Sequence, residues 1–526
     1  MAVPPGTRTP RRGAAARASR IALPLAGGAL IGLSLPPIAT WPVGIVGVAC
    51  VVRSLSGRSW KGRLGVGLLA GLGQFSIALA WALQFNTAGY VALVIVETLI
   101  LSVGLLLAPA RGVLRVPAVA GAATLAEWVR QSWPFGGLPL GSAALGQVGG
   151  PLQFTSRLGG PLLVVFALFL AGGAIGELAA AAVERPLPAL FPAVGSLVAA
   201  SALAAAGAFA GPAGLASSHG PERELRVAIV QGGGKRGLDQ LQVPPSVVYQ
   251  AALSETAHVT GHPQLILWPE DVVAMGSVPF AGSAVERQLA AIARSYHSTF
   301  VVGVTEDVGA TRFRNEVVAF SPAGRVVATF EKVHRVPFGE YVPYRSFFSH
   351  FANLKDVPRD AIPGTGSGMI ATPAGRFAVL ISYEVFFADR GRSGVRAGGR
   401  MILVPTNTSS YSNDQAPSQE IAASRLQALE EGRYVLQAAP TGYSAIVTPS
   451  GVVEDRTALS KPAVIEARVP LLDGSTPYTD AGDEWVLIVS ALLLVLGWLG
   501  ASRTEGSGEE GGTGSAERVG ERLAGA

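Results

Sequence analysis

A series of apolar blocks before residue 212 constrains the fold of this chain more than any other feature. Arg, Pro or Gly bounds each block, and the blocks are 21–36, 39–55, 64–83, 88–110, 114–130, 159–182 and 188–211. A helix that spans a bilayer needs about 20 apolar residues, within a range of about 17–25. The first two blocks are short, so they either span or form one helical hairpin that spans only in part. A further block at 485–501 brings the expected number of spans to eight.

Composition favours lipid rather than water around these helices. Hydrophobic residues make up 49% of the 526 residues and charged residues only 15%, whereas an ordinary soluble domain is about 25% charged. Too little polar surface remains to cover seven helices in water. The net charge is +5, but many arginines lie between apolar blocks rather than on one basic face with interleaved aromatics. This distribution argues against nucleic acid as a partner.

Basic residues mark one side of the membrane. The N-terminal tail carries five arginines, and the even-numbered junctions between blocks carry Arg53, Arg58, Lys61, Arg63, Arg111, Arg115 and Arg185. The opposite junctions carry only Arg130 and Arg157. Because basic loops stay in the cytoplasm, we expect both termini there and the region after residue 212 on the other side. Since further spans follow at once, the first block is expected to be retained rather than cleaved as a signal peptide.

The pattern of the sequence changes at Glu224, where short strands begin to alternate with amphipathic helices. This pattern predicts an α/β domain of roughly 260 residues, which is large enough for its own core. Helical periodicity is clear at 284–295 and 419–431. The expected strands are 225–231, 265–268, 300–304, 316–320, 326–330, 377–381, 401–404, 434–438 and 444–448.

These patterns divide the chain into six segments. The segments are a basic cytoplasmic tail (1–20), a transmembrane domain of seven spans (21–211), a small-residue linker (212–223), an extracytoplasmic α/β domain (224–484), a C-terminal transmembrane helix (485–501) and a disordered, low-complexity cytoplasmic tail (502–526). The residues that point to chemistry lie in the α/β domain.

Three apolar strands of this domain are followed by unexpected polar residues. The first ends in Trp-Pro-Glu, the second is followed by a lysine and then a glutamate eight residues later, and the third is followed by Ser-Tyr-Glu. The polar residues are Glu270, Lys332, Glu340, Ser382, Tyr383 and Glu384. Taken singly, a carboxylate or serine after a strand is usually a loop or capping residue, and a lone lysine is usually on the surface.

Taken together, these residues resemble the nitrilase superfamily, which uses a Glu–Lys–Cys triad on an α-β-β-α sandwich. Within it, the eight-span layout resembles the apolipoprotein N-acyltransferases. The motifs that carry the resemblance are WPFGGLP (133–139), VQG (230–232), WPE (268–270), Lys332, VPFGEYVP (336–343), YE (383–384) and RLQALEEGR (425–433). The VPFGEYVP and ALEEGR runs are the most specific of these.

The resemblance implies a role for each site residue. Glu270 aligns with the general base, Lys332 with the cation that stabilises the tetrahedral oxyanion, and Glu340 with a second carboxylate that orients the site. Tyr383 and Glu384 flank the nucleophile. Acyl transfer requires a nucleophile beside a base and a positive charge aimed at the developing oxyanion. Three strand ends of one sheet are suited to hold such groups rigidly.

Ser382 stands where the family has its cysteine. The chain has one cysteine, Cys50, which lies in the second apolar block. A serine hydroxyl is far less acidic than a thiol and needs a better base than a carboxylate usually provides. Two hypotheses follow: a working Ser382 nucleophile with Glu270 as base, or an inactive or altered site. His334 shares a face with Lys332 only if the strand continues, and no G-x-S-x-G elbow surrounds the serine.

Other features are weaker candidates. The family's Asn-(small)-Ala-Trp-Phe-Gly loop is replaced here by Asn407–Ser412, so its aromatic-glycine turn is expected to be lost. Gly232–Lys235 lacks the spacing of a phosphate-binding loop and is expected to be a solvated turn. Glu97 lies in the middle of an apolar block, which is either a functional position or a protonated carboxyl buried against a neighbouring helix.

Two further expectations concern ligands and lipid. The six histidines show no metal-ligand spacing, so we predict no metal, and no cofactor is implied. An arm rich in aromatic residues lies beside Glu340, and it is either core or an outward arm at the lipid interface that would suit a phospholipid. The aromatic residues are Phe338, Tyr341, Tyr344, Phe347, Phe348 and Phe351.

The resemblance implies a multi-pass protein of the bacterial inner membrane that transfers an acyl chain from a phospholipid to the amine of a lipoprotein's N-terminal diacylglyceryl-cysteine. A rival hypothesis is a non-catalytic relative that binds lipid or lipoprotein and supports a paralogue or partner enzyme. A third is a tethered carbon–nitrogen hydrolase, which fits the triad but not the eight spans.

Overall fold

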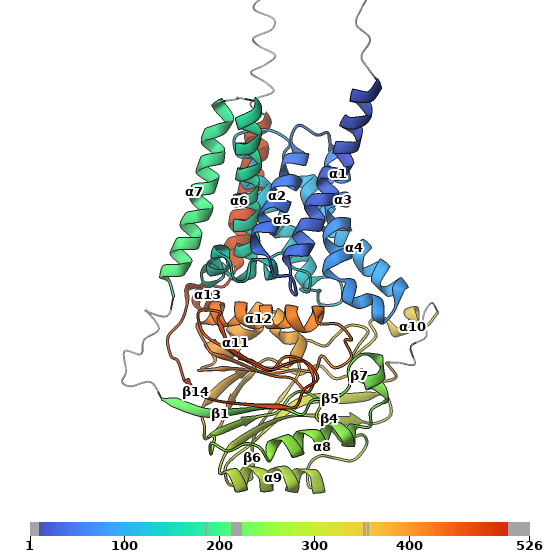
Figure 1. The fold of residues 1–526 in the computed structure, drawn as a ribbon, viewed down its shortest axis with the longest axis vertical. Coiled ribbons are helices and arrows are strands. Elements are labelled where there is room, and N and C mark those ends of the chain that lie inside the picture. Colours follow the sequence, from blue (N-terminus) through green and yellow to red (C-terminus); the bar gives the residue numbers. More distant parts are fainter. Residues whose placement is uncertain (1–9, 185–186, 212–222, 351–353, 355–356, 503–526) are drawn as a thin grey trace, which may run out of the picture.

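The computed structural model describes residues 10–184, 187–211, 223–350, 354 and 357–502. A helical bundle and an α/β sandwich lie end to end along the long axis of the molecule (Figure 1). Most of the expected linker (212–222), the first nine residues of the N-terminal tail (1–9) and nearly all of the C-terminal tail (503–526) lie outside the described residues.

The bundle consists of the helices that the apolar blocks predict. Their bounds are α1 (Pro10–Ser34), α2 (Trp41–Leu55), α3 (Trp60–Ala78), α4 (Thr87–Leu107), α5 (Arg115–Ser132), α6 (Ser156–Glu184), α7 (Leu187–Phe209) and a C-terminal helix (Glu484–Ser502). Within the described ranges, four helical segments are long and apolar enough to cross a membrane: Thr87–Leu107, Pro151–Val183, Leu190–Phe209 and Glu484–Ser502. Ser19–Ser34 and Trp41–Leu55 are apolar but shorter.

Small residues let α1 and α3 pack closely. A Cβ atom on Gly28 would lie 1.9 Å from the carbonyl oxygen of Ala70, and one on Gly73 would lie 2.3 Å from that of Leu25. Helices in lipid gain stability mainly from such close van der Waals packing, because lipid tails are as apolar as the helices themselves.

The sandwich contains two sheets whose strands come from separate parts of the sequence. The first has the order β14-β1-β2-β4-β5-β6, with β3 on β4 and β7 on β5, and the second has the order β13-β12-β11-β10-β9-β8. The strand bounds are β1 (Glu224–Gln231), β2 (Leu265–Leu267), β3 (Val273–Ala274), β4 (Thr299–Val308), β5 (Arg312–Phe320), β6 (Val326–Glu331), β7 (Asp360–Ala361), β8 (Met369–Ala371), β9 (Arg376–Val379), β10 (Ile402–Pro405), β11 (Val435–Ala438), β12 (Ala445–Val447), β13 (Val453–Arg456) and β14 (Ala463–Pro470).

Alternation along each strand builds two apolar layers at once. On β1, Val227 and Ile229 point to the core between the sheets, whereas Ala228 and Val230 point to the core beneath the outer helices. Because successive side chains of a strand face opposite sides of the sheet, a strand covered on both sides must be apolar throughout. This explains why the strands of the α/β domain appear as short continuous apolar runs.

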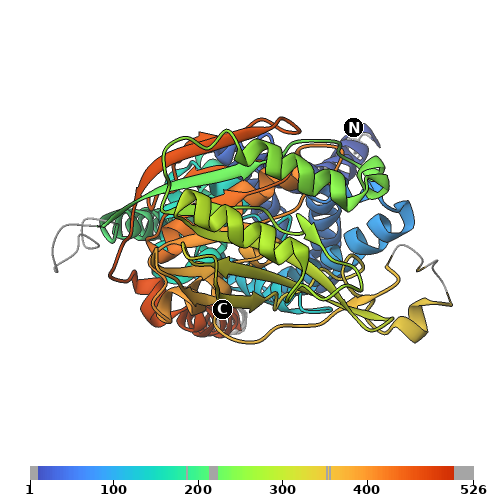
Figure 2. The ribbon, with the colours of Figure 1, turned by 90° about the horizontal axis from the view of Figure 1, so that it is seen from below.

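Helices cover both outer faces of the sandwich. The bounds of the helices in this domain are α8 (Pro245–Thr256), α9 (Ala284–Tyr296), α10 (Arg345–Phe348), α11 (Ala388–Arg396), α12 (Gln415–Glu431) and α13 (Pro477–Ala481). Helices α8 and α9 cross the outer face of the first sheet (Figure 2). Helices α11 and α12 lie between the second sheet and the bundle (Figure 1), where one hydrophobic cluster continues from the sheet into the bundle.

Candidate active site

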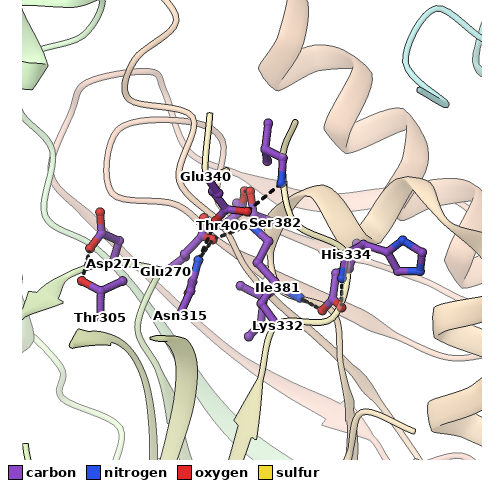
Figure 3. A network of polar contacts seen from close by, with 12 residues as sticks. Glu270, Asp271, Thr305, Asn315, Lys332, His334, Glu340, Ile381, Ser382 and Thr406 are labelled. Atoms are coloured by element: carbon purple, nitrogen blue, oxygen red, sulfur yellow. Dashed lines mark hydrogen bonds and ion pairs between the residues drawn. The ribbon is translucent and has the colours of Figure 1, made fainter. Parts of the chain in front are cut away.

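The polar residues after the strands converge on one buried lysine. Lys332 follows β6, and its Nζ lies 2.9 Å from Oε1 of Glu270 and 2.9 Å from Oε1 of Glu340 (Figure 3). The lysine is 2% exposed. Burial alone would lower the pKa of Lys332, but the two carboxylates outweigh it and hold the pKa above its ordinary value. The cation is therefore retained inside the protein, where a fixed charge acts most strongly on a developing oxyanion.

Asn315 is a member of this cluster that the sequence analysis missed. It lies on β5, and its Nδ2 donates hydrogen bonds of 2.8 Å to both Glu270 and Glu340. The backbone amide of Lys332 also donates to the carbonyl oxygen of Asn315, at 2.8 Å. The asparagine therefore spaces the two carboxylates around the lysine. The sequence does not single out Asn315, because it lies within a strand and no motif surrounds it.

The backbone of the Trp-Pro-Glu segment can pack closely on β4 only because the residue that it contacts there is a glycine. Glu270 follows β2, and a Cβ atom on Gly303 of β4 would lie 2.5 Å from the Cα atom of Glu270. Glu340 is fixed in turn by the Val336 amide, which donates to its Oε2 at 2.7 Å. Both carboxylates are thus held by backbone geometry as well as by the lysine.

Ser382 occupies a constrained turn beside this cluster. It follows β9 of the second sheet, whereas Glu270 and Lys332 follow strands of the first, so the expectation that one sheet holds all three is wrong. Ser382 begins the short 3-10 helix η6 (Ser382–Phe386), has a φ of 51° and is 9% exposed. A non-glycine residue in the left-handed region is uncommon, and such residues gather at functional sites. The Oγ of Ser382 lies 3.2 Å from the Oγ1 of Thr406, the residue that follows β10.

Thr406 joins Ser382 to a second buried carboxylate. Its hydroxyl donates to Oε1 of Glu420 on α12, and Gln437 donates to the other oxygen of Glu420 at 3.4 Å. Burial, followed by the charge of Glu270, raises the pKa of Glu420 to about 8 although Thr406 and Lys332 act against the shift. Neither Thr406 nor Glu420 was expected from sequence.

The Glu384 side chain holds the backbone on either side of the site and does not face the reaction centre. Its Oε1 accepts hydrogen bonds from the amides of Val333 (2.9 Å) and His334 (3.2 Å), and its Oε2 accepts one from Ile381 (2.8 Å). Burial raises the pKa of Glu384, whereas Arg390 and these amides lower it. The side chain ties the turn of Ser382 to the segment after Lys332.

His334 does not assemble into a serine triad. The strand β6 ends at Glu331, and the His334 ring stacks on Phe387 with their centroids 4.1 Å apart. Figure 3 shows the imidazole directed away from Ser382. Burial lowers the pKa of His334 although Asp389 opposes the shift. The histidine is part of the packing.

Tyr383 and the aromatic arm connect the site to the bundle. The hydroxyl of Tyr383 donates to the carbonyl oxygen of Gly137 at 2.9 Å, and that of Tyr341 donates to the carbonyl oxygen of Phe135 at 2.9 Å. The Phe135 ring contacts the rings of Phe338, Tyr344 and Phe348. Phe351, the remaining member of the expected arm, lies outside the described residues.

The loop Asn407–Ser412 still supplies an aromatic ring, which contacts the bundle. Tyr411 makes edge contacts with Trp81 and Phe85, whose ring centroids lie 5.5 and 5.3 Å away. The side chain of Arg236 donates to the carbonyl oxygen of Tyr411 at 2.9 Å. The expectation that this loop loses its aromatic-glycine turn is correct for the glycine, but an aromatic ring from the loop packs against the bundle.

Glu97 is an ion-paired carboxylate rather than a neutral one. Its Oε2 lies 2.6 Å from Nε of Arg130, which also contacts Glu127 at 3.0 Å and donates to the carbonyl oxygen of Leu140 at 2.8 Å. Glu97 is thus buried against the neighbouring helix α5, and its contact with the Arg130 cation favours an ionised carboxylate over the protonated one of the second hypothesis. Arg130 itself is 1% exposed, so it does not lie in a solvated loop.

Three remaining expectations concern metals, the glycine run and the cysteine. Within the described ranges, no group of three or more His, Cys, Asp or Glu is arranged to hold a metal ion. The amides of Gly233 and Gly234 donate to the carbonyl oxygens of Pro440 and Ser460, so this turn uses its donors internally. Cys50 lies in α2, in the bundle rather than in the sandwich that holds the Lys332 cluster.

Known proteins resemble both halves of the chain. The apolipoprotein N-acyltransferase N-terminal domain matches residues 27–174, and the carbon-nitrogen hydrolase family matches residues 226–473. An apolipoprotein N-acyltransferase of Mycolicibacterium smegmatis is 30% identical over 92% of this chain and 85% of its own length. One from Azotobacter vinelandii is 29% identical over 90% of this chain and 94% of its own length.

Solved structures resemble about half of the chain. An amidase from Nesterenkonia sp. is 20% identical and covers 47% of this chain and 90% of its own, with a TM-score of 0.35. A member of the nitrilase superfamily from Saccharomyces cerevisiae is 20% identical over the same shares of the two chains, also with a TM-score of 0.35.

Proposed function

This chain belongs to the apolipoprotein N-acyltransferase family, and on that premise we propose that it transfers an acyl chain from a phospholipid to the N-terminal diacylglyceryl-cysteine amine of lipoproteins. The observation that carries the proposal is the buried Glu270–Lys332–Glu340 cluster beside Ser382. The cluster places a fixed cation and carboxylates where acyl transfer needs them.

The proposed reaction has two steps. In the first, Ser382 Oγ bonds to the acyl carbonyl carbon, Lys332 stabilises the oxyanion, and the bond to the glycerol oxygen breaks, so that lysophospholipid leaves with the serine's proton. In the second, the lipoprotein amine bonds to the acyl carbon and the ester bond to Ser382 breaks. The resemblance implies Glu270 as the base for Ser382, but no hydrogen bond joins these two residues within the described part of the chain. We therefore propose Glu270 as the base that carries the amine's proton to the departing serine oxygen, and Glu340, Tyr383 and Glu384 as residues that position the site.

We propose that lipid approaches the site past the aromatic arm. Phe338, Tyr344 and Phe347 are 44%, 75% and 58% exposed, and Trp133 on the adjoining loop is 60% exposed. The segment around α10 projects from the side of the molecule in both views (Figures 1 and 2). Aromatic side chains favour the boundary between lipid and water, so this edge suits a donor whose acyl chains remain in the bilayer.

We also propose that the chain has eight spans and the domain bounds expected from the sequence. In this proposal it lies in the bacterial inner membrane, with both termini in the cytoplasm and the sandwich on the other side. Two observations support this arrangement. The amide of Gly57 donates to the carbonyl oxygen of Ala110, so two of the basic connections lie together. Arg130 and Arg157, the arginines on the opposite side, are 1% and 2% exposed and therefore add no charge to a solvated loop.

Thiol labelling in whole cells tests the topology. In a Cys50→Ser background, Val278→Cys places a thiol on the sandwich and Lys61→Cys places one on a basic connection. We expect a membrane-impermeant maleimide to label residue 278 in intact cells and residue 61 only after lysis. Labelling at residue 61 in intact cells would overturn the orientation.

An acylation assay tests the function. The purified protein is incubated with phospholipid carrying a labelled acyl chain, and the covalent adduct is measured with Ser382→Ala and Ser382→Cys as matched variants. We expect an adduct in the native protein, none in the alanine variant and a faster one in the cysteine variant.

The alternative function rests on the serine itself. Because Ser382 replaces the family's cysteine, we also consider a catalytically impaired relative that binds lipid or lipoprotein and supports a partner enzyme. An adduct that forms only in Ser382→Cys would favour this alternative, and an adduct in the native protein would exclude it.

A further inference from the structure

The hydroxyl of Ser382 is linked through Thr406 to the buried carboxylate of Glu420. A hydroxyl has one hydrogen to donate, and Thr406 directs its own to Oε1 of Glu420. Thr406 is also the donor to Ser382, whose Oγ lies 3.2 Å from the Thr406 oxygen. Its one hydrogen therefore serves one contact at a time, and while it lies on Glu420 the Thr406 oxygen can accept a hydrogen from Ser382. The resulting chain runs from Ser382 to Thr406 to Glu420, and it joins η6, the end of β10 and α12.

Glu270 makes no corresponding contact. Its Oε1 accepts from Lys332 and from Asn315, and within the described part of the chain no hydrogen bond joins Glu270 to Ser382. Figure 3 shows Thr406 directly beside Ser382. Thr406, rather than Glu270, is thus the hydrogen-bonding partner of Ser382.

The environment of Glu420 makes it a stronger base than an ordinary carboxylate. It is 2% exposed, and the charged or titratable groups that act on it or feel its charge are Glu270, Lys332 and Tyr411. Burial is the main cause that raises the pKa of Glu420 to about 8. A general base is most effective when its pKa lies near the working pH, and a serine needs such a base more than a thiol does.

We propose that Thr406 and Glu420 form a proton relay that activates Ser382, an inference that rests on the acyltransferase function proposed above. As Oγ of Ser382 bonds to the acyl carbon, its proton passes to the Thr406 oxygen and the Thr406 proton passes to Glu420. The carbonyl electron pair moves onto its oxygen beside Lys332. When the bond to the glycerol oxygen breaks, that oxygen takes the proton back from Glu420 through Thr406, and lysophospholipid leaves.

The relay explains how serine replaces cysteine at this position. A thiol loses its proton near pH 8.5 without help, so a cysteine at residue 382 does not depend on a relay. The same scaffold with serine requires one. The relay residues should therefore matter in the serine protein and matter little after Ser382→Cys.

Paired variants in two backgrounds test the relay. Glu420→Gln and Thr406→Val each remove one link, and each is made with Ser382 and with Ser382→Cys. General base catalysis contributes about 100-fold or more, so we expect the rate of adduct formation to fall on the order of 100-fold in the serine background and only a few-fold in the cysteine background. Thr406→Ser keeps the hydroxyl and should restore most of the rate.

Two further measurements separate a relay from a structural role. The rate with Ser382 should rise with pH to a plateau near pH 8, and Glu420→Gln should abolish that rise. Thr408→Val removes a hydroxyl of the same loop that has no hydrogen-bond partner within the described residues, and it should leave the rate unchanged.

Each contrary result has a distinct meaning. Equal losses in both backgrounds would show a structural role and overturn the relay. An unchanged rate and pH profile in Glu420→Gln would overturn the relay while leaving the proposed acyltransferase intact. An absent adduct in the native protein, with an adduct in Ser382→Cys, would overturn serine catalysis and the relay together.

Discussion

The hydroxyl of Tyr383 donates a hydrogen bond of 2.9 Å to the carbonyl oxygen of Gly137, so the residue after the proposed nucleophile is tied to the loop that follows α5. Gly137 has a φ of 91°, and a Cβ atom there would lie 2.1 Å from the backbone of Gln131. Only glycine therefore fits this point of contact. The contact makes the geometry of the site depend on the bundle.

Removing this hydroxyl should loosen the connection without removing the ring. Tyr383→Phe keeps the edge contact with Phe387, whose centroid lies 5.1 Å away, but leaves the Gly137 carbonyl without this donor. We expect a loss of about 1 kcal/mol in stability and faster hydrogen exchange at the amide of Leu138, measured in detergent. Tyr249→Phe removes a hydroxyl bound to Gln288 on the outer layer, and exchange at Leu138 should not change there.

Replacing the buried lysine should remove catalysis. Lys332→Met leaves Glu270 and Glu340 facing each other across Asn315 without the cation between them. The loss of one oxyanion-stabilising group costs about 100- to 1000-fold in rate, and we expect a loss of this size in labelled adduct. The control is Lys235→Met at an exposed position. A native rate in Lys332→Met would contradict the role assigned to the lysine.

Glu384→Gln should slow the reaction without moving its pH dependence. Three backbone amides donate to the two carboxylate oxygens, and an amide side chain offers only one acceptor oxygen. Leaving a buried donor unpaired costs about 1–3 kcal/mol, so thermal unfolding should occur at a lower temperature. The midpoint of the pH–rate profile should stay in place, because Glu384 carries no proton in the reaction. The exposed Glu454→Gln serves as the control.

The buried ion pair of the bundle should show strong coupling. Removing one partner of a buried pair costs about 3–5 kcal/mol, because the other charge is left uncompensated. In Glu97→Gln the arginine keeps its contact with Glu127, so we expect a smaller fall in unfolding temperature than in Arg130→Met, which leaves both carboxylates without their cation. The double variant Glu97→Gln/Arg130→Met should cost less than the sum of the single variants. Leu99→Ala, on the exposed face of the same helix, should show no coupling to Arg130→Met.

The sandwich should lose stability as the pH rises. Burial, more than any other cause, raises the pKa of Glu431 to about 8, whereas glutamate in an unfolded chain titrates near about 4.3. The folded protein therefore holds a proton that the unfolded chain has lost, and this contribution is complete below pH 4 and disappears as the pH rises to 8. Glu431→Gln should reduce the difference between unfolding temperatures at pH 5 and pH 8.5. An unchanged difference would contradict the prediction.

Nine strand positions were predictable, but β3, β7, β8, β13 and β14 were not expected from the sequence. The nine expected strands coincide with β1, β2, β4, β5, β6, β9, β10, β11 and β12. Strand β9 ends at Val379, two residues before the expected end, because the chain turns there toward Ser382. Strands β3 and β7 have two residues each, which is too short for any periodicity to appear in the sequence. Strand β14 has eight residues and was missed despite its length.

The helix α12 shows a different limit of sequence reasoning. Helical periodicity is clear over 419–431, but the helix begins four residues earlier, at Gln415. It is buried along nearly its whole length, including Gln419, Glu420 and Gln427. A helix between a sheet and a bundle has no solvent face, so its polar residues face other protein groups. No pattern of polar residues could show which of them face the site.

The amino-acid sequence alone was enough to locate the apolar helices and most strands of the sandwich. It was also enough to pick out Glu270, Lys332, Glu340 and Ser382 as polar residues that follow these strands. These features depend on local composition and on residue spacing, which are readable along one chain. The partners of those residues were decided only by tertiary structure: Asn315 reaches the carboxylates because β5 pairs beside β6, and Glu420 reaches Thr406 because α12 packs on the second sheet beneath the bundle. Contacts between distant segments depend on how sheets pair and layers stack, and a linear pattern does not record either.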